Sequence, residues 1–309
     1  MFEPDQMTNR RAISVGVFDG VHRGHRHLIA RAREQALQQN LPLTVLTFDP
    51  HPRSVVNEQP VPALATLPER VDLLRACGAD DVVVLHFDQE LAHTTPEEFV
   101  ERVLVGTWQA GHVIVGENFR FGAGAAGTVQ TLRDLGRHWG FDVTAVSLAA
   151  APEGVWSSSV IRGLLRDGNV EQAAVALLRP FRLTGVVVAG ERRGRELGFP
   201  TANLDVVDGL LIPADGVYAA YLVDGSLVDG SQRHPAAVSI GTNPQFDGQH
   251  RTVEAYVLDR DDLDLYGRVL GLDFVGRIRG QAVFESTDAL IDRMHQDVAE
   301  CRVLLAQRP

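Results

Sequence analysis

The hydrophobic pattern of this 309-residue chain changes near Pro180, and that change limits the folds it can adopt. Before this point, short β-branched runs alternate with segments of helical periodicity. After it, short strand-like runs follow one another, separated by turn signals such as Pro213-Ala214-Asp215-Gly216. Alternating strands and helices are typical of a parallel sheet covered by helices, whereas successive short strands are typical of a barrel. The pattern therefore predicts two domains of different class, 1–178 and 179–309.

The first half is predicted to form a Rossmann-like, doubly wound parallel sheet in an α/β domain. Its expected strands are 12–18, 43–48, 81–86, 112–115 and 142–147. A capping box from Thr95 to Glu98 predicts one helix start, and Gly140 predicts one helix end. Ligands of such sheets bind beyond the carboxyl ends of the strands, so the loops that follow the strands should carry the site.

The second half is predicted to form a small β-barrel with a C-terminal helix. The expected strands are 183–189, 217–223, 236–240, 253–259 and 269–274. The helix should run from Thr287 to about Ala306, because Leu290, Val298 and Cys301 fall on one apolar stripe of helical spacing.

The charged residues exclude several classes of phosphate site. The formal net charge is −11, and all 29 basic residues are arginine. A Walker A loop and a protein kinase both need a lysine, so neither fits this sequence. Phosphate binding must therefore use arginine, histidine, backbone N–H groups and metal. The acidic balance also argues against a nucleic-acid partner.

The remaining composition points to a cytoplasmic protein that acts on small molecules. Two cysteines, Cys77 and Cys301, are too few for a disulfide framework. No apolar signal core begins the chain, and no run is long enough to span a membrane, so no membrane partner is expected. The oligomeric state stays open between a monomer and a weak homo-oligomer.

The most informative segment is Asp19-Gly20-Val21-His22-Arg23-Gly24-His25, which follows the first expected strand. Free N–H groups and the positive dipole end at a helix start form an anion site, to which two imidazoles can add donors. Gly24 would let a nucleotide approach the backbone. The His-x-Gly-His pattern resembles the nucleotidyltransferase signature. The alternative is a pair of ordinary histidines at a helix start.

Further segments of the first half have two interpretations each. Gly122 to Gly127 matches G-x-G-x-x-G, but its late position argues against a dinucleotide fingerprint and favours a flexible loop. The segment Ser157-Ser158-Ser159 with Arg162 could clamp an anion or could simply cap a helix. Phe48-Asp49-Pro50-His51-Pro52 predicts a stiff loop at the carboxyl edge of the sheet, which could belong to the site or could be a rigid connector with a surface histidine.

The second half contains one sharp segment, from Gly190 to Asn203. Its three arginines among glycines could wrap phosphates. Thr201 and Asn203 alternate onto one face of an extended run, where their oxygens suit a hard cation. The alternative is an exposed, charged hairpin.

Taken in order, these segments resemble the bacterial bifunctional riboflavin kinase/FAD synthetase family. The first half carries Gly-x-Phe-Asp-Gly-Val-His-x-Gly-His, Phe-Asp-Pro-His-Pro, Gly-Glu-Asn-Phe-x-Phe-Gly and Ser-Ser-Ser-x-Ile-Arg. The second half carries Gly-Arg-x-Leu-Gly-Phe-Pro-Thr-Ala-Asn, the most specific match, followed by Ser-Ile-Gly-Thr-Asn-Pro and Thr-Val-Glu-Ala-Tyr. The resemblance runs from about Ala12 to the C-terminus.

The resemblance implies two activities and their small-molecule partners. The barrel would phosphorylate riboflavin to FMN with ATP, and the α/β nucleotidyltransferase domain would adenylylate FMN to FAD and release pyrophosphate. It implies Mg²⁺ as cofactor. Two rivals are a kinase whose first half is only supporting, and a flavin or nucleotide sensor without catalysis.

The resemblance also assigns residues. In the first half, His22, Gly24 and His25 would hold the ATP phosphates together with Gly16, Phe18, Asp19 and Gly20. A second clamp would be Ser158, Ser159 and Arg162, with Ser159 where the family usually has threonine, and FMN would lie near Asn118, Phe121 and Gly122. In the second half, Glu254 would be the base, Thr201 and Asn203 would bind Mg²⁺, and ATP or flavin would contact Gly190, Arg192, Gly194, Arg195, Gly198, Phe199, Pro200 and Asn243.

Overall fold

The computed structural model describes residues 10–147, 156–189, 198–225, 232–242, 251–260 and 262–307. By residue contacts the chain divides into two compact units. The first consists of Met1–Val61 and Leu67–Ser157, and the second of Pro62–Thr66 and Ser158–Pro309. Each unit is described separately.

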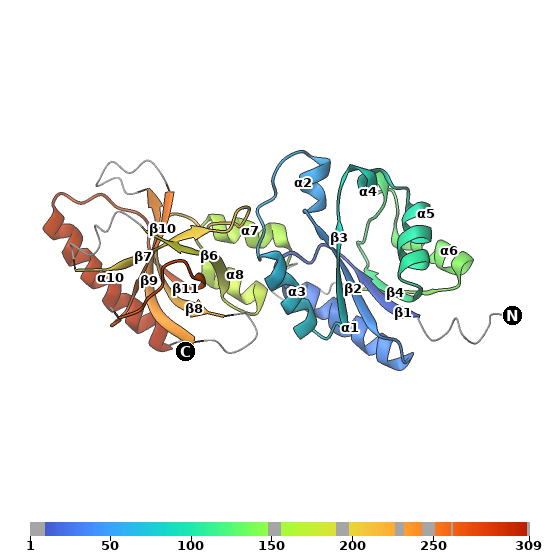
Figure 1. Ribbon diagram of the computed structural model, residues 1–309, viewed down its shortest axis with the longest axis horizontal. Helices are drawn as coiled ribbons and strands as arrows, with labels where there is room; N and C mark the ends of the chain where they lie inside the picture. The colour runs from blue at the N-terminus through green and yellow to red at the C-terminus, as the bar shows by residue number, and fades with distance from the viewer. Residues whose placement is uncertain are drawn as a thin grey trace. The chain divides into compact units, whose positions relative to one another are not determined.

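The first unit is built on a parallel sheet of five strands in the order β3-β2-β1-β4-β5 (Figure 1). The strands are β1 (Arg11–Val15), β2 (Leu43–Asp49), β3 (Asp81–His86), β4 (Ala110–Gly116) and β5 (Asp142–Val146). This order confirms the predicted doubly wound sheet, because the chain moves outward from β1 to β3 and then returns to the other side of β1.

The helices of the first unit cover both faces of its sheet. They are α1 (Arg23–Gln38), α2 (Pro52–Val56), α3 (Leu67–Ala76), α4 (Gln89–His93), α5 (Pro96–Glu98) and α6 (Val129–Trp139), with the short turns η2 (Asp19–Val21) and η4 (Ala123–Ala125) and the π-helix η3 (Phe99–Thr107). Helix α1 packs on β1, β2 and β4. On the opposite face, Ile13 and Val113 pack with Phe99, Leu104 and Leu132 in one apolar core.

Two predicted helix signals of the first unit are confirmed. The hydroxyl of Thr95 accepts from the N–H of Glu98, and the Glu98 carboxylate accepts from the N–H of Thr95, which is a complete capping box. Gly140 ends α6 in the left-handed conformation, with φ of 76°.

The second unit contains a closed antiparallel barrel in the order β10-β7-β6-β11-β8-β9, as the barrel prediction required (Figure 1). Its strands are β6 (Phe181–Val188), β7 (Thr201–Val206), β8 (Gly216–Asp224), β9 (Gln232–Thr242), β10 (Arg251–Val257) and β11 (Val269–Arg279). Strand β7 was predicted only as an extended run, because it is short and begins directly after a proline.

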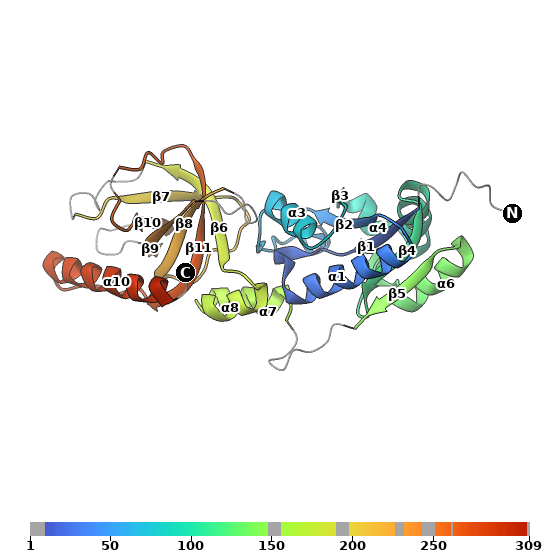
Figure 2. The same cartoon turned by 90° about the horizontal axis from the view of Figure 1, so that it is seen from below.

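The predicted C-terminal helix is α10 (Thr287–Gln307), which lies along the barrel (Figure 2). It packs on β8, β9 and β11, and its Cys301 and Leu305 are buried against Ala219 and Val275. Burial raises the pKa of the Cys301 thiol to about 12, so this thiol is an inert core group.

Two further helices, α7 (Ser158–Arg166) and α8 (Val170–Leu177), belong by packing to the barrel unit. Helix α8 packs on β6 and β11. The N–H of Arg277 donates to Glu171 Oε1 at 2.9 Å, and Arg277 Nη1 donates to the carbonyl of Asp167 at 3.0 Å. The contacts thus divide the chain before Ser158, whereas the sequence prediction divided it after Leu178.

Candidate active sites

The first candidate site lies where the sheet order of the first unit reverses. Strand β1 has β2 on one side and β4 on the other, and the chain leaves the carboxyl ends of β1 and β4 toward different connections. Loops at such a point are free to hold a ligand. The turn that carries His22 follows β1, and the exposed Asn118 follows β4. The topology therefore brings two sequence-predicted segments to the same edge.

The turn after β1 has an unusual backbone. Phe18, Gly20 and Val21 have φ values of 51°, 75° and 43°, and the left-handed region is unfavourable for a β-branched residue such as Val21. The first strand therefore ends at Val15, earlier than the predicted Phe18. A Cβ on Gly16 would lie 2.9 Å from the buried Phe18 ring. Gly16, Phe18 and Gly20 thus shape the turn itself.

His22 and His25 stand together at the start of α1. Their rings stack with 3.6 Å between centroids and 19° between planes, and the Phe18 ring meets His25 edge-on at 5.3 Å. Among the described residues, neither buried Nδ1 atom has a hydrogen-bond partner. A buried polar atom without a partner needs an explanation, and a bound anion would supply one.

Burial keeps both imidazoles uncharged near neutral pH. Desolvation lowers the pKa of His22 to about 4. The pKa of His25 is lowered well below its ordinary value, first by burial and then by the nearby His22. Neutral rings can each donate one hydrogen bond, and the N–H groups of the first helical turn add donors that have no partner within the helix. The helix start thus offers several donors to one oxyanion.

Gly24 lies in close contact with its surroundings. A Cβ at this position would lie 3.2 Å from His22 Cε1 and 3.9 Å from the carbonyl oxygen of Trp156. Glycine therefore lets α1 begin next to the segment that leads to Ser158. Ser158 and the exposed Ser159 start α7 as predicted, and the buried Arg162 donates through Nε to the carbonyl of Pro62 at 2.7 Å. These three residues belong to the second unit, so their action on the same phosphates as His22 stays a prediction.

The predicted FMN residues differ in exposure. Asn118 is exposed, whereas the ring of Phe121 is 7% exposed and packs 5.4 Å from Phe119 and 5.9 Å from Phe99. Gly122 has φ of 72°, and a Cβ there would meet Pro96 at 2.7 Å. Phe121 and Gly122 thus support the loop, and Asn118 is the predicted residue with a free side-chain surface.

The second candidate site lies on two neighbouring barrel strands. The register pairs Glu254 of β10 with Asn203 of β7, and Tyr256 with Thr201. Thr201 Oγ1 donates to Glu254 Oε2 at 3.1 Å, and the Thr252 hydroxyl lies 3.3 Å from both Glu254 Oε1 and the carbonyl oxygen of Gly241, so these two acceptors share its proton. Two hydroxyls therefore hold one carboxylate, beside an amide oxygen on the same face.

An aromatic contact anchors the segment before β7. Phe199 is buried, and its ring lies 5.3 Å from Tyr256 and 5.0 Å from His295 of α10. Gly198 has φ of 88°, and Pro200 is exposed. The other predicted residues of this site, Gly190, Arg192, Gly194, Arg195 and Asn243, lie outside the described residues.

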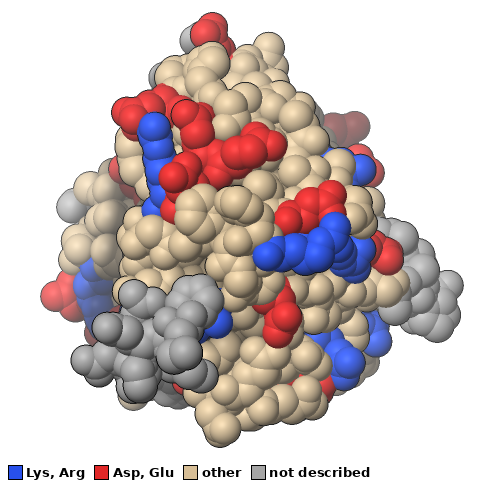
Figure 3. All heavy atoms as spheres, turned by 90° about the vertical axis from the view of Figure 1, so that its right-hand side faces the viewer, with Lys and Arg blue, Asp and Glu red and all other residues tan. Residues whose placement is uncertain are grey.

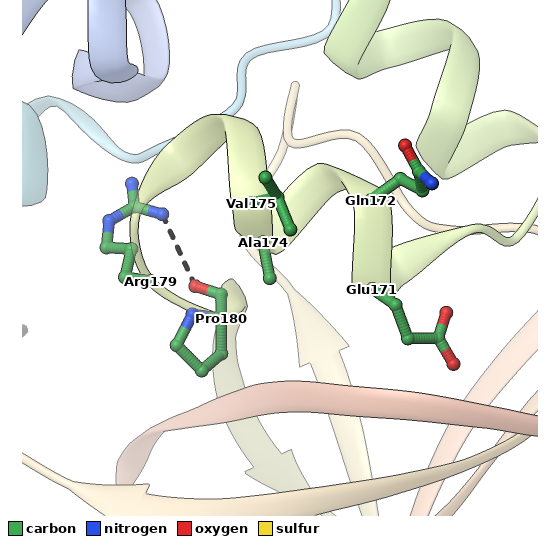
Figure 4. Close-up of a pocket in the computed structure, with 6 residues that line it drawn as sticks. All are labelled: Glu171, Gln172, Ala174, Val175, Arg179 and Pro180. Carbon is green, nitrogen blue, oxygen red and sulfur yellow. Dashed lines mark hydrogen bonds between the residues drawn. The ribbon is translucent and has the colours of Figure 1, made fainter. Parts of the chain in front are cut away.

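A shallow pocket of about 400 Å³ in the second unit is separate from both sites (Figure 4). Six residues of α8 and the connection to β6 line it, and Arg179 Nη1 donates to the carbonyl of Pro180. None of the sequence-predicted site residues is among them. We therefore do not assign this pocket to either active site.

Sequence reasoning missed one buried charge at the first site, Arg70 of α3. Its guanidinium reaches the segment that follows β1 and the carboxyl end of β2. In the sequence it is one of two arginines on this helix and one of 29 in the chain, so no local signal marks it.

The surface and the helices bear on the partner predictions. On the face shown in Figure 3, arginine and acidic side chains lie interspersed. In the part of the chain that the structure describes, no helix has the length and hydropathy needed to cross a bilayer.

Each half of the chain matches a known protein family. The FAD synthetase family model matches residues 5–160, and the riboflavin kinase family model matches residues 177–305. The bifunctional riboflavin kinase/FMN adenylyltransferase of Escherichia coli K12 is 35% identical over 94% of this chain and 91% of its own, and that of Pseudomonas fluorescens is 35% identical over 95% and 92%. A crystal structure from Streptococcus pneumoniae, described as a macrolide-efflux protein, matches with a TM-score of 0.83, 30% identity and coverage of 96% and 95%. The chain therefore belongs to the bifunctional riboflavin kinase/FMN adenylyltransferase family.

Proposed function

We propose that this protein makes both flavin cofactors from riboflavin. The barrel unit transfers the γ-phosphoryl group of ATP to riboflavin and forms FMN, and the α/β half transfers AMP from a second ATP to FMN, forming FAD and pyrophosphate. The observation that carries the proposal is the Glu254 carboxylate, which two threonine hydroxyls hold on the barrel of a chain from this family. A sensor would need no such base.

In the kinase step, Glu254 acts on the terminal hydroxyl of riboflavin. An alcohol is a poor nucleophile, so a carboxylate that accepts its proton assists attack on the γ-phosphorus. The new O–P bond forms as the bond to the ADP oxygen breaks. Thr201 and Thr252 hold the carboxylate oxygens, which fixes the direction of the base. In this proposal, ATP and the flavin contact a set of residues from the segment before β7 and from the position after β9: Gly190, Arg192, Gly194, Arg195, Gly198, Phe199, Pro200 and Asn243.

Thr201 and Asn203 fit the proposed Mg²⁺. Hydroxyl and amide oxygens are ligands for a hard cation. The register pairs Asn203 with Glu254, and the Thr201 hydroxyl donates to Glu254 Oε2. When bound, Mg²⁺ would neutralise negative charge on the ATP phosphates.

In the adenylyl transfer step, the FMN phosphate is already a nucleophile and needs no base. The site must align it with the α-phosphorus and stabilise charge on the departing pyrophosphate. The donors come from His22, His25 and the first turn of α1. The backbone that brings these donors to the phosphates is shaped by Gly16, Phe18, Asp19, Gly20 and Gly24. Ser158, Ser159 and Arg162 complete the clamp, and Asn118, Phe121 and Gly122 form the FMN side.

The functional halves extend over residues 1–178 and 179–309 in this proposal. The division by contacts differs from this boundary, because α7 and α8 pack with the second unit. A cytoplasmic location remains a prediction.

The test is incubation of the purified protein with riboflavin, ATP and Mg²⁺, followed by separation of flavins by chromatography. Appearance of FMN and then FAD, with matching ADP and pyrophosphate, supports both steps. FMN without FAD would leave only the kinase, and unchanged riboflavin would contradict the proposal.

A further inference from the structure

Arg70 is a buried cation that joins the turn after β1 to the end of β2. It belongs to α3, and the residue is 6% exposed. Nη1 donates to the carbonyl oxygens of Val17 at 3.1 Å and Phe48 at 2.9 Å, and it lies 3.4 Å from Thr47 Oγ1. Val17 follows β1, and Phe48 lies at the end of β2. One guanidinium therefore fixes the carboxyl ends of two neighbouring strands.

The charge around Arg70 suits this position. Burial lowers the pKa of Arg70, and the nearby carboxylates of Asp19 and Asp49 oppose this effect, with Asp49 Oδ1 at 3.5 Å from Nη2. Asp49 belongs to the Phe-Asp-Pro-His-Pro loop, and Asp19 belongs to the turn that carries His22. An arginine stays charged in such surroundings and can donate in several directions at once.

The contact with Val17 acts on the strained turn. Thr47 Oγ1 donates to the same carbonyl at 2.9 Å, so two donors hold the peptide that directly precedes Phe18. Phe18, Gly20 and Val21 then take left-handed conformations before His22. Such a backbone persists only where its surroundings hold it. The orientation of His22 thus depends on the anchor at Val17.

We propose that Arg70 is a positioning residue for adenylyl transfer, which holds the His22 turn and the Asp49 loop in their ATP-binding arrangement without contacting the substrate. This inference rests on the proposed function of the first half. It predicts that loss of the guanidinium impairs FAD synthesis in a protein that is still folded and still phosphorylates riboflavin.

The experiment compares Arg70→Met and Arg70→Lys with Arg75→Met, an exposed arginine on the same helix. Arg70→Met should lower kcat/KM for ATP in FAD synthesis by about 30-fold or more, because a mispositioned site loses transition-state stabilisation. Arg70→Lys should be intermediate, since one ammonium keeps the charge but not the planar fork. Arg75→Met should match wild type.

Riboflavin phosphorylation by the same preparations is the internal control and should stay within about twofold of wild type. A second readout is chemical rescue. Added guanidinium ion should raise the rate of FAD synthesis by Arg70→Ala and leave the rates of wild type and Arg75→Ala unchanged. A purely structural role would lower the unfolding temperature without selective loss or rescue.

Unchanged FAD synthesis in Arg70→Met would overturn the inference. Parallel loss of both activities in Arg70→Met and Arg70→Lys, without rescue, would overturn it as well. Failure of the wild-type protein to make FAD would instead refute the proposed function, so the two failures are distinguishable.

Discussion

The imidazole rings of His22 and His25 lie face to face, 3.6 Å apart, at the first turn of α1. Two charged rings would repel at this distance, and burial already disfavours charge on either. The two rings are therefore neutral hydrogen-bond donors that are already in place before an anion binds. Their effects on stability and catalysis can be measured.

The buried His22 should make the first unit less stable in mild acid. Its pKa falls from 6.5 in the unfolded chain to about 4 in the folded one, so the unfolded state takes up a proton first as pH falls. Stability is full above pH 6.5 and declines toward pH 4, by about 3 kcal/mol for this group. Urea unfolding at several pH values checks this. His22→Gln should flatten the decline, and the exposed His138→Gln should not.

His25→Ala should impair FAD synthesis selectively. Removal of one preorganised donor to the phosphates should lower kcat by about 100-fold, because such donors stabilise charge that develops in the transition state. FMN formation by the same variant should be normal. Separate assays with supplied FMN and with riboflavin measure the two steps, and His138→Ala is the matched control. Undiminished FAD synthesis would remove His25 from the phosphate site.

Glu254→Gln should have the opposite effect. The amide keeps the shape of the side chain but cannot accept the proton of the riboflavin hydroxyl, so FMN formation should fall by about 100-fold to 10,000-fold. FAD synthesis from supplied FMN should continue. Glu285→Gln, an exposed change in the same unit, should leave both rates intact. FMN production near the wild-type rate would refute the role of Glu254 as base.

Thr201 should affect the Mg²⁺ dependence of the kinase. Thr201→Val removes the hydroxyl that donates to Glu254 Oε2, and it also removes a proposed cation ligand. The kinase rate should fall by about 100-fold at low Mg²⁺ and recover partly as Mg²⁺ rises. Thr201→Ser keeps the hydroxyl and should stay close to wild type. Equal Mg²⁺ profiles for Thr201→Val and wild type would contradict the ligand role.

The sequence predicts the architecture well because both halves follow simple periodic patterns. Strand β3 begins and ends at the predicted residues, and α10 extends over the predicted apolar stripe. The end of β1 was predicted too late, since the apolar Val17 and Phe18 continue the strand pattern while tertiary contacts turn the backbone. Strand β7 was missed as a named element because Pro200 and a short run obscured its pattern.

The candidate sites are less predictable than the fold. A local motif predicted His22 and the family resemblance predicted Glu254 as site residues, but the burial of a side chain depends on residues distant in sequence. Phe121 illustrates the limit, because its ring packs against Phe99 and Phe119 in the core. Arg70 illustrates the reverse, because its partners Val17 and Phe48 lie 53 and 22 residues away.

The segment Pro62–Thr66 has a consequence for how the two halves can be separated. It leaves the α/β half and joins the barrel unit, where the N–H of Ala63 donates to the carbonyl of Gly209 and the N–H of Leu211 donates to the carbonyl of Ala63. Helix α8, which precedes residue 179 in the sequence, likewise packs on β11. A barrel fragment that starts at residue 179 would lose both, so a single cleavage of the polypeptide cannot release a kinase module with all of its native packing.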